Sequence, residues 1–214
     1  MTPRARGAEA TRPLPVAVIV LCGVLVGVYS FELALSWREG PAELESLLHG
    51  FGLVPREVLR GRVLTPVTAL FLHADPLHLL ANVAFLAGFG RVVEPALGAR
   101  RFLALFALAG VAAAALHVAS APRSFVPTVG ASGAVSGVLG AWWRLRDRPG
   151  APPPRLARAP ALTLLALWLA AQLQAALSSG ATAAGWAHLG GFAAGLLLAP
   201  RLLPVSPRTP PDLK

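Results

Sequence analysis

The sequence is poor in charged residues and in several residue types that soluble proteins use freely. Only 14% of its 214 residues are charged, 55% are hydrophobic, and it has a single cysteine, a single methionine and a single tyrosine. With a mean hydropathy of +0.63, the chain is too apolar for an ordinary soluble domain of this length. One cysteine, Cys22, excludes an intrachain disulfide. The composition therefore predicts a membrane protein.

Acidic residues are scarce beside basic ones, with 10 Asp and Glu against 19 Lys and Arg and a formal net charge of +9. In a soluble protein this excess would suggest nucleic-acid binding. Here the cations lie between apolar runs, so we expect membrane lipid and no nucleic acid as a partner. The sequence lacks a His-Glu-x-x-His pair and any His, Cys and carboxylate cluster with zinc spacing. We therefore expect no metal and no other cofactor.

Six apolar segments account for most of the chain. They lie at about residues 14–36, 66–89, 101–120, 130–145, 160–178 and 185–204. Because crossing a hydrocarbon core takes about 20 apolar residues, the sequence predicts an all-α, polytopic membrane protein with a bundle of six transmembrane helices. The membrane domain is expected at 13–204, with short tails at 1–12 and 205–214. The first run is longer than a signal-peptide core and lacks a small-residue cleavage site, which favours a retained span.

Arginines concentrate in alternate connections. They follow the second and fourth segments and occur in the last tail, whereas the connection at 119–128 has one Arg and the one at 178–185 has no charge. The positive-inside rule then places both tails in the cytoplasm. The bias towards Arg, Ala, Pro and Gly suggests a GC-rich bacterial genome, and hence a plasma membrane.

Two external connections have features of their own. The connection at 38–65 is too long for a simple tether, and its apolar residues predict a short amphipathic helix in the membrane interface or against the bundle. The uncharged connection at 178–185 is rich in Gly, Ala and Ser and is a candidate mobile cap over an active site.

Polar residues inside membrane spans are costly and are functional candidates for that reason. His78 and Asn82 are four residues apart in PLHLLANVAF, so both lie on one face of the second helix. They could hydrogen-bond to a neighbouring helix and stitch the bundle together. Alternatively, they are two donors directed at a reacting group.

The fourth segment begins VGASGAVSGVLGA, in which small residues dominate one side. A small-residue packing face explains the glycines of this segment. It does not explain Ser132 at the start of the span. A helix N-terminus offers unpaired backbone N–H groups, which can stabilise a developing oxyanion beside a serine hydroxyl.

The sixth segment, GWAHLGGFAAGLLLA, places His188, Gly191 and Gly195 on one face. If this face meets the glycines of the fourth segment, His188 can reach Ser132 and act as its general base. A buried histidine alone is more often structural, but here a nucleophile and oxyanion donors accompany it. No carboxylate lies in the last three segments, which favours a Ser-His dyad over a triad.

Together these residues resemble the rhomboid family of intramembrane serine proteases, over about residues 12–204. Four pieces match in order: FLHADPLHLLAN, EPALG, GASGAVSGVLGA and WAHLGGFAAG. The resemblance implies that Ser132 is the nucleophile and His188 the general base, and that His78, Asn82 and the Ser132 backbone N–H hold the oxyanion. It also implies that the substrates are single-span membrane proteins, cut near the outer face of the membrane, and that His73 is structural.

Two positions depart from the family pattern. Gly61-Arg62 stands where the family often has Trp-Arg, and Ser136 replaces an aromatic residue that often stacks on the catalytic histidine. Neither change removes a reacting group. A catalytically silent relative that binds or escorts membrane helices is the alternative, although it should have lost Ser132 or His188. A small transporter is a weaker third option, because the last three segments lack the charges that would line a path.

Overall fold

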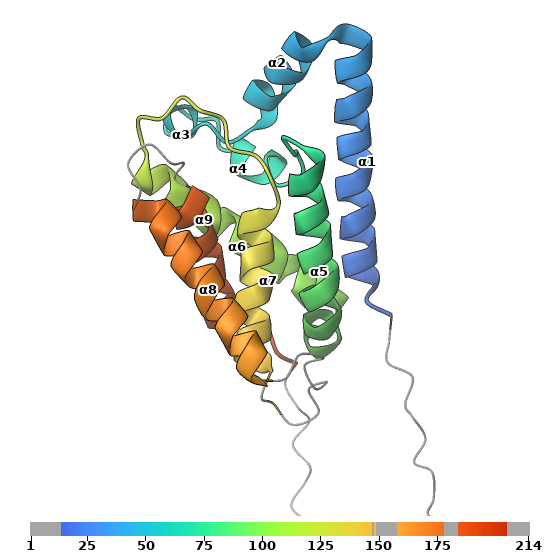
Figure 1. Cartoon of the computed structure of the whole chain (residues 1–214), viewed down its shortest axis with the longest axis vertical. Helices are drawn as coiled ribbons and strands as arrows, with labels where there is room; N and C mark the ends of the chain where they lie inside the picture. The colour runs from blue at the N-terminus through green and yellow to red at the C-terminus, as the bar shows by residue number, and fades with distance from the viewer. Residues whose placement is uncertain (1–13, 147, 149–157, 178–183, 205–214) are drawn as a thin grey trace, which may run out of the picture.

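The computed structural model describes residues 14–146, 148, 158–177 and 184–204. Within these residues the regular structure is nine helices and one isolated β-bridge (Figure 1). The helices are α1 Val16–Glu39, α2 Pro41–Phe51, α3 Pro55–Val58, α4 Thr65–Thr68, α5 Pro76–Leu97, α6 Ala99–Ser120, α7 Ser132–Leu145, α8 Arg158–Leu177 and α9 Ala184–Leu198. The expected tails at 1–12 and 205–214, and most of the expected cap at 178–185, lie outside the described residues.

A helix lies at each of the six predicted segments, but the bounds of the second one were wrong. The prediction began this helix at residue 66, whereas α5 begins at Pro76. Asp75 is the N-cap of α5, and its side chain accepts a hydrogen bond of 2.8 Å from the backbone N–H of His78. Proline at the first helical position reinforces this start. The residues before it form α4 and a turn.

The far end of α5 also differs from the prediction. Arg91 and Glu94 were expected in a loop, but both lie inside α5, and Gly98 alone separates α5 from α6. The buried Glu94 carboxylate accepts hydrogen bonds from the backbone N–H groups of Ala17 (2.9 Å) and Val18 (2.8 Å). Both N–H groups belong to the first turn of α1 and have no acceptor within that helix. Glu94 therefore ties the start of α1 to the end of α5.

Three long apolar helices stand out in the part of the chain that the structure describes. Among the described residues α1, α5 and α6 are long and apolar enough to cross a membrane, and α9 is a shorter apolar helix. At 1.5 Å per residue, the 14 residues of α7 extend only about 21 Å. The number of spans, six, therefore stays a prediction.

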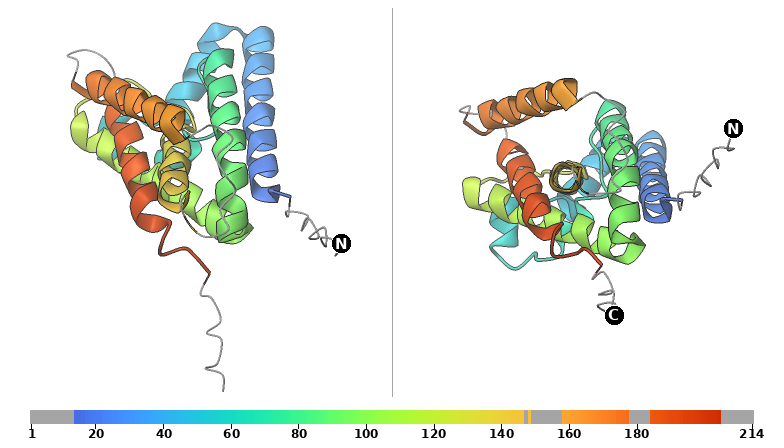
Figure 2. Two further views of the ribbon diagram at one scale, coloured as in Figure 1. Left: turned by 60° about the horizontal axis from the view of Figure 1, so that its bottom comes forward. Right: turned by 90° about the horizontal axis from the view of Figure 1, so that it is seen from below.

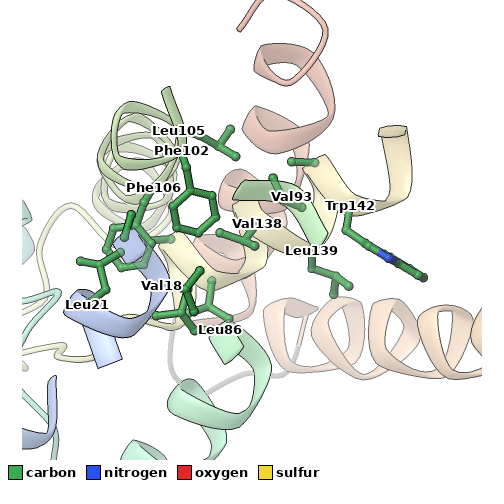
Figure 3. Close-up of a cluster of buried hydrophobic side chains, with 14 of the residues drawn as sticks. Val18, Leu21, Leu86, Val93, Phe102, Leu105, Phe106, Val138, Leu139 and Trp142 are labelled. Atoms are coloured by element: carbon green, nitrogen blue, oxygen red, sulfur yellow. The ribbon is translucent and has the colours of Figure 1, made fainter. Parts of the chain in front are cut away.

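Helix α7 occupies the centre of the bundle and packs against α5, α6 and α9 (Figures 1 and 2). Eleven of its 14 residues are buried. Its apolar side chains meet those of α1, α5 and α6 in one core (Figure 3). The labelled members of this core are Val18, Leu21, Leu86, Val93, Phe102, Leu105, Phe106, Val138, Leu139 and Trp142. The first residue of α7, Ser132, is thus fixed by a helix that packs against α5, α6 and α9.

The contact between α7 and α9 is a glycine seam, formed by Gly133 and Gly137 of α7 with Gly191 and Gly195 of α9. A Cβ atom at Gly191 would lie 1.9 Å from the carbonyl oxygen of Gly133, and a Cβ at Gly195 would lie 1.9 Å from that of Gly137. No side chain fits at such distances. The two backbones are therefore in direct contact, as expected for small-residue packing between membrane helices.

We predict that Gly195→Ala forces α7 and α9 apart and lowers the free energy of unfolding by about 1–3 kcal/mol, the usual cost of overpacking. Gly27→Ala is the matched control, because a Cβ at Gly27 on α1 would meet nothing within 4 Å. Thermal unfolding in detergent micelles measures both variants. Equal stability of the two variants would contradict the direct backbone contact.

Candidate active site

The long connection between α1 and α5 contains the expected amphipathic helix, which is α2. Beyond α2, Leu53 pairs with Thr128 through two backbone hydrogen bonds of 2.9 Å each, forming the β-bridge. The guanidinium of Arg56 lies 4.4 Å from the ring centroid of Phe125. Arg62 donates to the Glu57 carboxylate and to backbone carbonyls at the end of α2. The connection therefore holds in place the loop that leads into α7.

Ser132 and His188 are brought together by the glycine seam. Ser132 is the first residue of α7, and His188 lies in the second turn of α9, directly before the glycines of that helix. The His188 Nε2 atom is 2.8 Å from the Ser132 Oγ atom, a hydrogen-bond distance. Two residues 56 positions apart in the chain thus lie within hydrogen-bond distance of each other, while their roles as nucleophile and base stay a prediction.

A cavity of about 140 Å³ opens beside this pair. Most of its wall is made of small or aliphatic residues from α4, α6, α7 and α9 and the loop before α7. The polar side chains in its wall belong to His78, His117, Thr128, Ser132 and His188. Thr128 Oγ1 lies 3.0 Å from His117 Nε2, which links the loop before α7 to α6. The serine hydroxyl therefore faces a confined, largely apolar space.

The ring of His78 occupies the space that a side chain at Gly130 would need. A Cβ atom at Gly130 would lie 2.5 Å from His78 Cε1 and 2.6 Å from Nε2. Gly130 also has φ +117°, a conformation that side chains other than glycine rarely adopt. Two independent constraints therefore require glycine two residues before Ser132, and His78 and Ser132 line the same cavity.

Asn82 lies one turn further along α5, buried at 3% exposure and not in the cavity wall. Its Nδ2 atom is 3.1 Å from the carbonyl oxygen of His78 and 3.3 Å from Nε2 of His73. Three of the four predicted site residues thus line the cavity, while the fourth supports His78 from behind.

His73 and Glu32 form the layer behind Asn82. Both are 1% exposed, and the backbone N–H of His73 lies 3.3 Å from each carboxylate oxygen of Glu32. His73 Nδ1 is 3.3 Å from the carbonyl of Phe71, and its ring meets that of His78 edge-on at 5.2 Å. These contacts fit the structural role expected of His73. Glu32 had no assigned role, although a carboxylate inside the first span was a signal in the sequence.

Gln172 of α8 is the site residue that sequence analysis missed. Its Oε1 atom lies 2.5 Å from Nδ1 of His188, on the side of the ring opposite Ser132. Only a carboxylate was expected to orient His188. A glutamine within the apolar run WLAAQLQ was nevertheless a polar residue in a predicted span, and such residues are functional candidates.

The fold and the site together define a class: a helical protein with a serine–histidine pair enclosed among apolar helices. The model of the rhomboid domain family matches residues 60–205, more than half of the chain. The chain belongs to the rhomboid family. The resemblance seen in the sequence is confirmed, and with its apolar helices the chain is a multi-pass membrane protein of a protease family.

Several curated proteins are similar to this chain. Rhomboid-like protease 3 of Toxoplasma gondii is 30% identical over 181 residues, which cover 80% of this chain and 63% of that protein. Rhomboid protease GluP of Bacillus subtilis (strain 168) is 40% identical over 80 residues, 37% of this chain and 15% of the relative. The chain spans less than two thirds of the length of these relatives.

Proposed function

We propose that this protein is an intramembrane serine endopeptidase that cleaves the transmembrane segments of single-span membrane proteins through a Ser132–His188 dyad. The observation that carries the proposal is the 2.8 Å contact between His188 Nε2 and Ser132 Oγ at the wall of a cavity. Membership of the rhomboid family supports the intramembrane setting.

In the proposed reaction Ser132 Oγ attacks the carbonyl carbon of the scissile peptide bond while His188 Nε2 takes the hydroxyl proton. The carbonyl π electrons move to the oxygen, which becomes an oxyanion. The oxyanion then collapses, the C–N bond breaks, and His188 returns the proton to the leaving nitrogen. Water, activated by the same histidine, hydrolyses the acyl-enzyme and regenerates Ser132. No cofactor takes part.

The oxyanion is assigned to His78, Asn82 and the backbone N–H of Ser132. The N–H groups in the first turn of α7 have no acceptor within the helix, and the positive end of the helix dipole favours negative charge there. The ring of His78 lies against Gly130, two residues before the nucleophile. The Ser132 N–H is fixed by the helix and needs no reorganisation when charge develops on the substrate oxygen, whereas Asn82 exchanges one of its present acceptors for that oxygen.

The proposed topology is a six-span domain over 13–204, with both short tails in the cytoplasm of a bacterial cell. The start of α1 and the end of α9 lie at the same end of the bundle (Figure 1). Arg91, Arg100 and Arg101 occur where α5 passes into α6 at that end. The positive-inside rule assigns it to the cytoplasm and the Ser132 end to the outer face.

A catalytically silent protein that binds or escorts membrane helices is the alternative function. The cavity and the enclosed helix surfaces would suit such a protein as well. The hydrogen bond between Ser132 and His188 favours the protease, because binding alone needs neither group in this relation.

Ser132→Ala is expected to abolish cleavage of a reporter whose single transmembrane helix has helix-breaking residues near its outer end, because the nucleophile is lost. Purified protein and reporter are reconstituted together in liposomes, and products are followed on gels. His188→Ala should be equally inactive.

Ser136→Ala is the matched control for this test. Ser136 is one turn further along α7, and its hydroxyl donates to the carbonyl of Ser132 at 2.7 Å, so turnover should stay within about fivefold of wild type, since a neutral hydrogen bond contributes only about 1 kcal/mol. Cleavage by Ser132→Ala would refute the mechanism. A reporter that co-purifies with wild type uncut would favour the escort function.

Asn82→Ala is expected to lower kcat by about 10²- to 10³-fold, the usual effect of removing one oxyanion donor. Asn82→Asp keeps the size of the side chain but replaces its N–H donors with a carboxylate, so it should be at least as slow. Leu80→Ala, on the exposed side of α5, is the control. Wild-type kcat in Asn82→Asp would contradict the donor role.

The topology predicts which added cysteines react with a membrane-impermeant maleimide in intact cells. In a Cys22→Ser background, Arg123→Cys should be labelled from outside. Arg101→Cys should be labelled only after the cells are permeabilised. Both positions are exposed and lie at opposite ends of α6. The reverse pattern would contradict the proposed orientation.

A further inference from the structure

The two ring nitrogens of His188 have different partners on opposite sides. Nε2 lies 2.8 Å from Ser132 Oγ in α7, and Nδ1 lies 2.5 Å from Gln172 Oε1 in α8. The three side chains form one hydrogen-bonded line from α8 through α9 to α7. An amide carbonyl oxygen can only accept, so the proton of the neutral ring belongs on Nδ1. Nε2 then has a free lone pair directed at the serine hydroxyl.

The aromatic support that is absent from position 136 is replaced from α8. The hydroxyl of Ser136 turns back to the carbonyl of Ser132 and gives His188 no platform. Trp168 lies one turn before Gln172 on α8, and its ring centroid is 6.4 Å from that of His188 and 5.7 Å from that of Phe192. Trp168 and Gln172 therefore share the face of α8 that meets α9. The imidazole is held from the side opposite α7.

We propose that Gln172 is a positioning residue that fixes the Nδ1–H tautomer of His188, with Trp168 supporting the ring in place of the missing aromatic residue. This inference rests on the proposed protease function, since it assigns Gln172 a role in the same reaction. Gln172 takes no proton itself. When His188 accepts the serine proton on Nε2, the hydrogen bond from Nδ1–H to Gln172 Oε1 remains. This bond keeps the imidazolium ring directed at Ser132.

A neutral acceptor suits this location. A carboxylate in the same place would hold the same N–H, but it would place a charge among apolar helices at a considerable cost in free energy. An amide oxygen orients the ring without that cost. It also stabilises the imidazolium less than a carboxylate does, so its main effect is on the tautomer and the direction of the ring.

The kinetic test introduces three substitutions at position 172 of the whole chain. Each variant is assayed on the reporter described above. Gln172→Leu removes the acceptor, and Gln172→Asn keeps the amide but is one methylene too short to reach. Both should lower kcat by about 10- to 100-fold, at most the low end of the roughly 10²- to 10⁴-fold that general-base catalysis contributes, with KM within about twofold. Gln172→Glu restores an acceptor and should recover most of the lost kcat. Gln174→Leu, two residues along α8, is the matched control and should keep wild-type kcat.

The second measurement reports the tautomer directly and does not need activity. Histidine is labelled with ¹⁵N, and the His188 ring signals are identified by their loss in His188→Ala. Wild type, Gln172→Glu and Gln174→Leu should show a neutral ring with the proton on Nδ1. Gln172→Leu and Gln172→Asn should show a mixture of both tautomers.

Three results would overturn the role of Gln172: wild-type kcat in Gln172→Leu, a lowered kcat with an unchanged tautomer, or a wild-type ring protonated on Nε2. Failure of the proposed function gives a different result. In that case wild type does not cut the reporter, and Ser132 does not react with a fluorophosphonate probe. The tautomer comparison alone then decides whether Gln172 fixes the tautomer of His188.

Discussion

Direct contact between the backbones of α7 and α9 is the constraint on which the rest of the site depends. At Gly191 and Gly195 there is no room for a single methyl group. This closeness brings a histidine of one helix within hydrogen-bond distance of a serine at the start of the other. A larger residue at either position would move His188 away from Ser132 even if every polar group were kept. The glycines are therefore as much a part of the site as the residues that face the cavity.

The remaining contacts hold the two ends of the bundle around this seam. The loop before α7 is paired with the connection between α1 and α5 through Leu53 and Thr128, so the start of α7 is fixed from outside the bundle. Behind the serine, Glu32 and His73 support Asn82, and Asn82 supports His78. At the other end Glu94 joins α1 to α5. Buried carboxylates thus accept hydrogen bonds from backbone N–H groups that apolar side chains cannot satisfy.

Much of this arrangement could be predicted from the sequence, because its signals are local. Runs of apolar residues place the long helices, and glycines at spacings of three and four predict the close helix pair. The start of α5 was also readable, since Asp75 followed by Pro76 is a helix start signal. It was missed because the apolar run begins ten residues earlier. Hydropathy marks where a chain meets lipid, and capping residues mark where its helix begins.

The parts that could not be predicted depend on contacts between distant segments. Nothing near Glu94 indicates that it binds the backbone of residues 17 and 18. Gln172 has no spacing relation to His188 within a helix, because the two lie on different helices whose relative rotation the sequence does not specify. Among the described residues three helices are identified as long and apolar enough to cross a membrane, and the central helix α7 is shorter, with 14 residues. Length predicts spans best for helices that lipid surrounds.

The amide of Asn82 already has two protein acceptors, the carbonyl of His78 and the ring of His73. A neutral substrate carbonyl gains little by competing for those N–H groups, because one ordinary hydrogen bond would replace another. A negatively charged oxygen is a stronger acceptor and can displace them. In the proposed reaction Asn82 would therefore respond to the charge of the intermediate and not to the bound peptide. Selectivity of that kind lowers the barrier without tightening the binding of substrate.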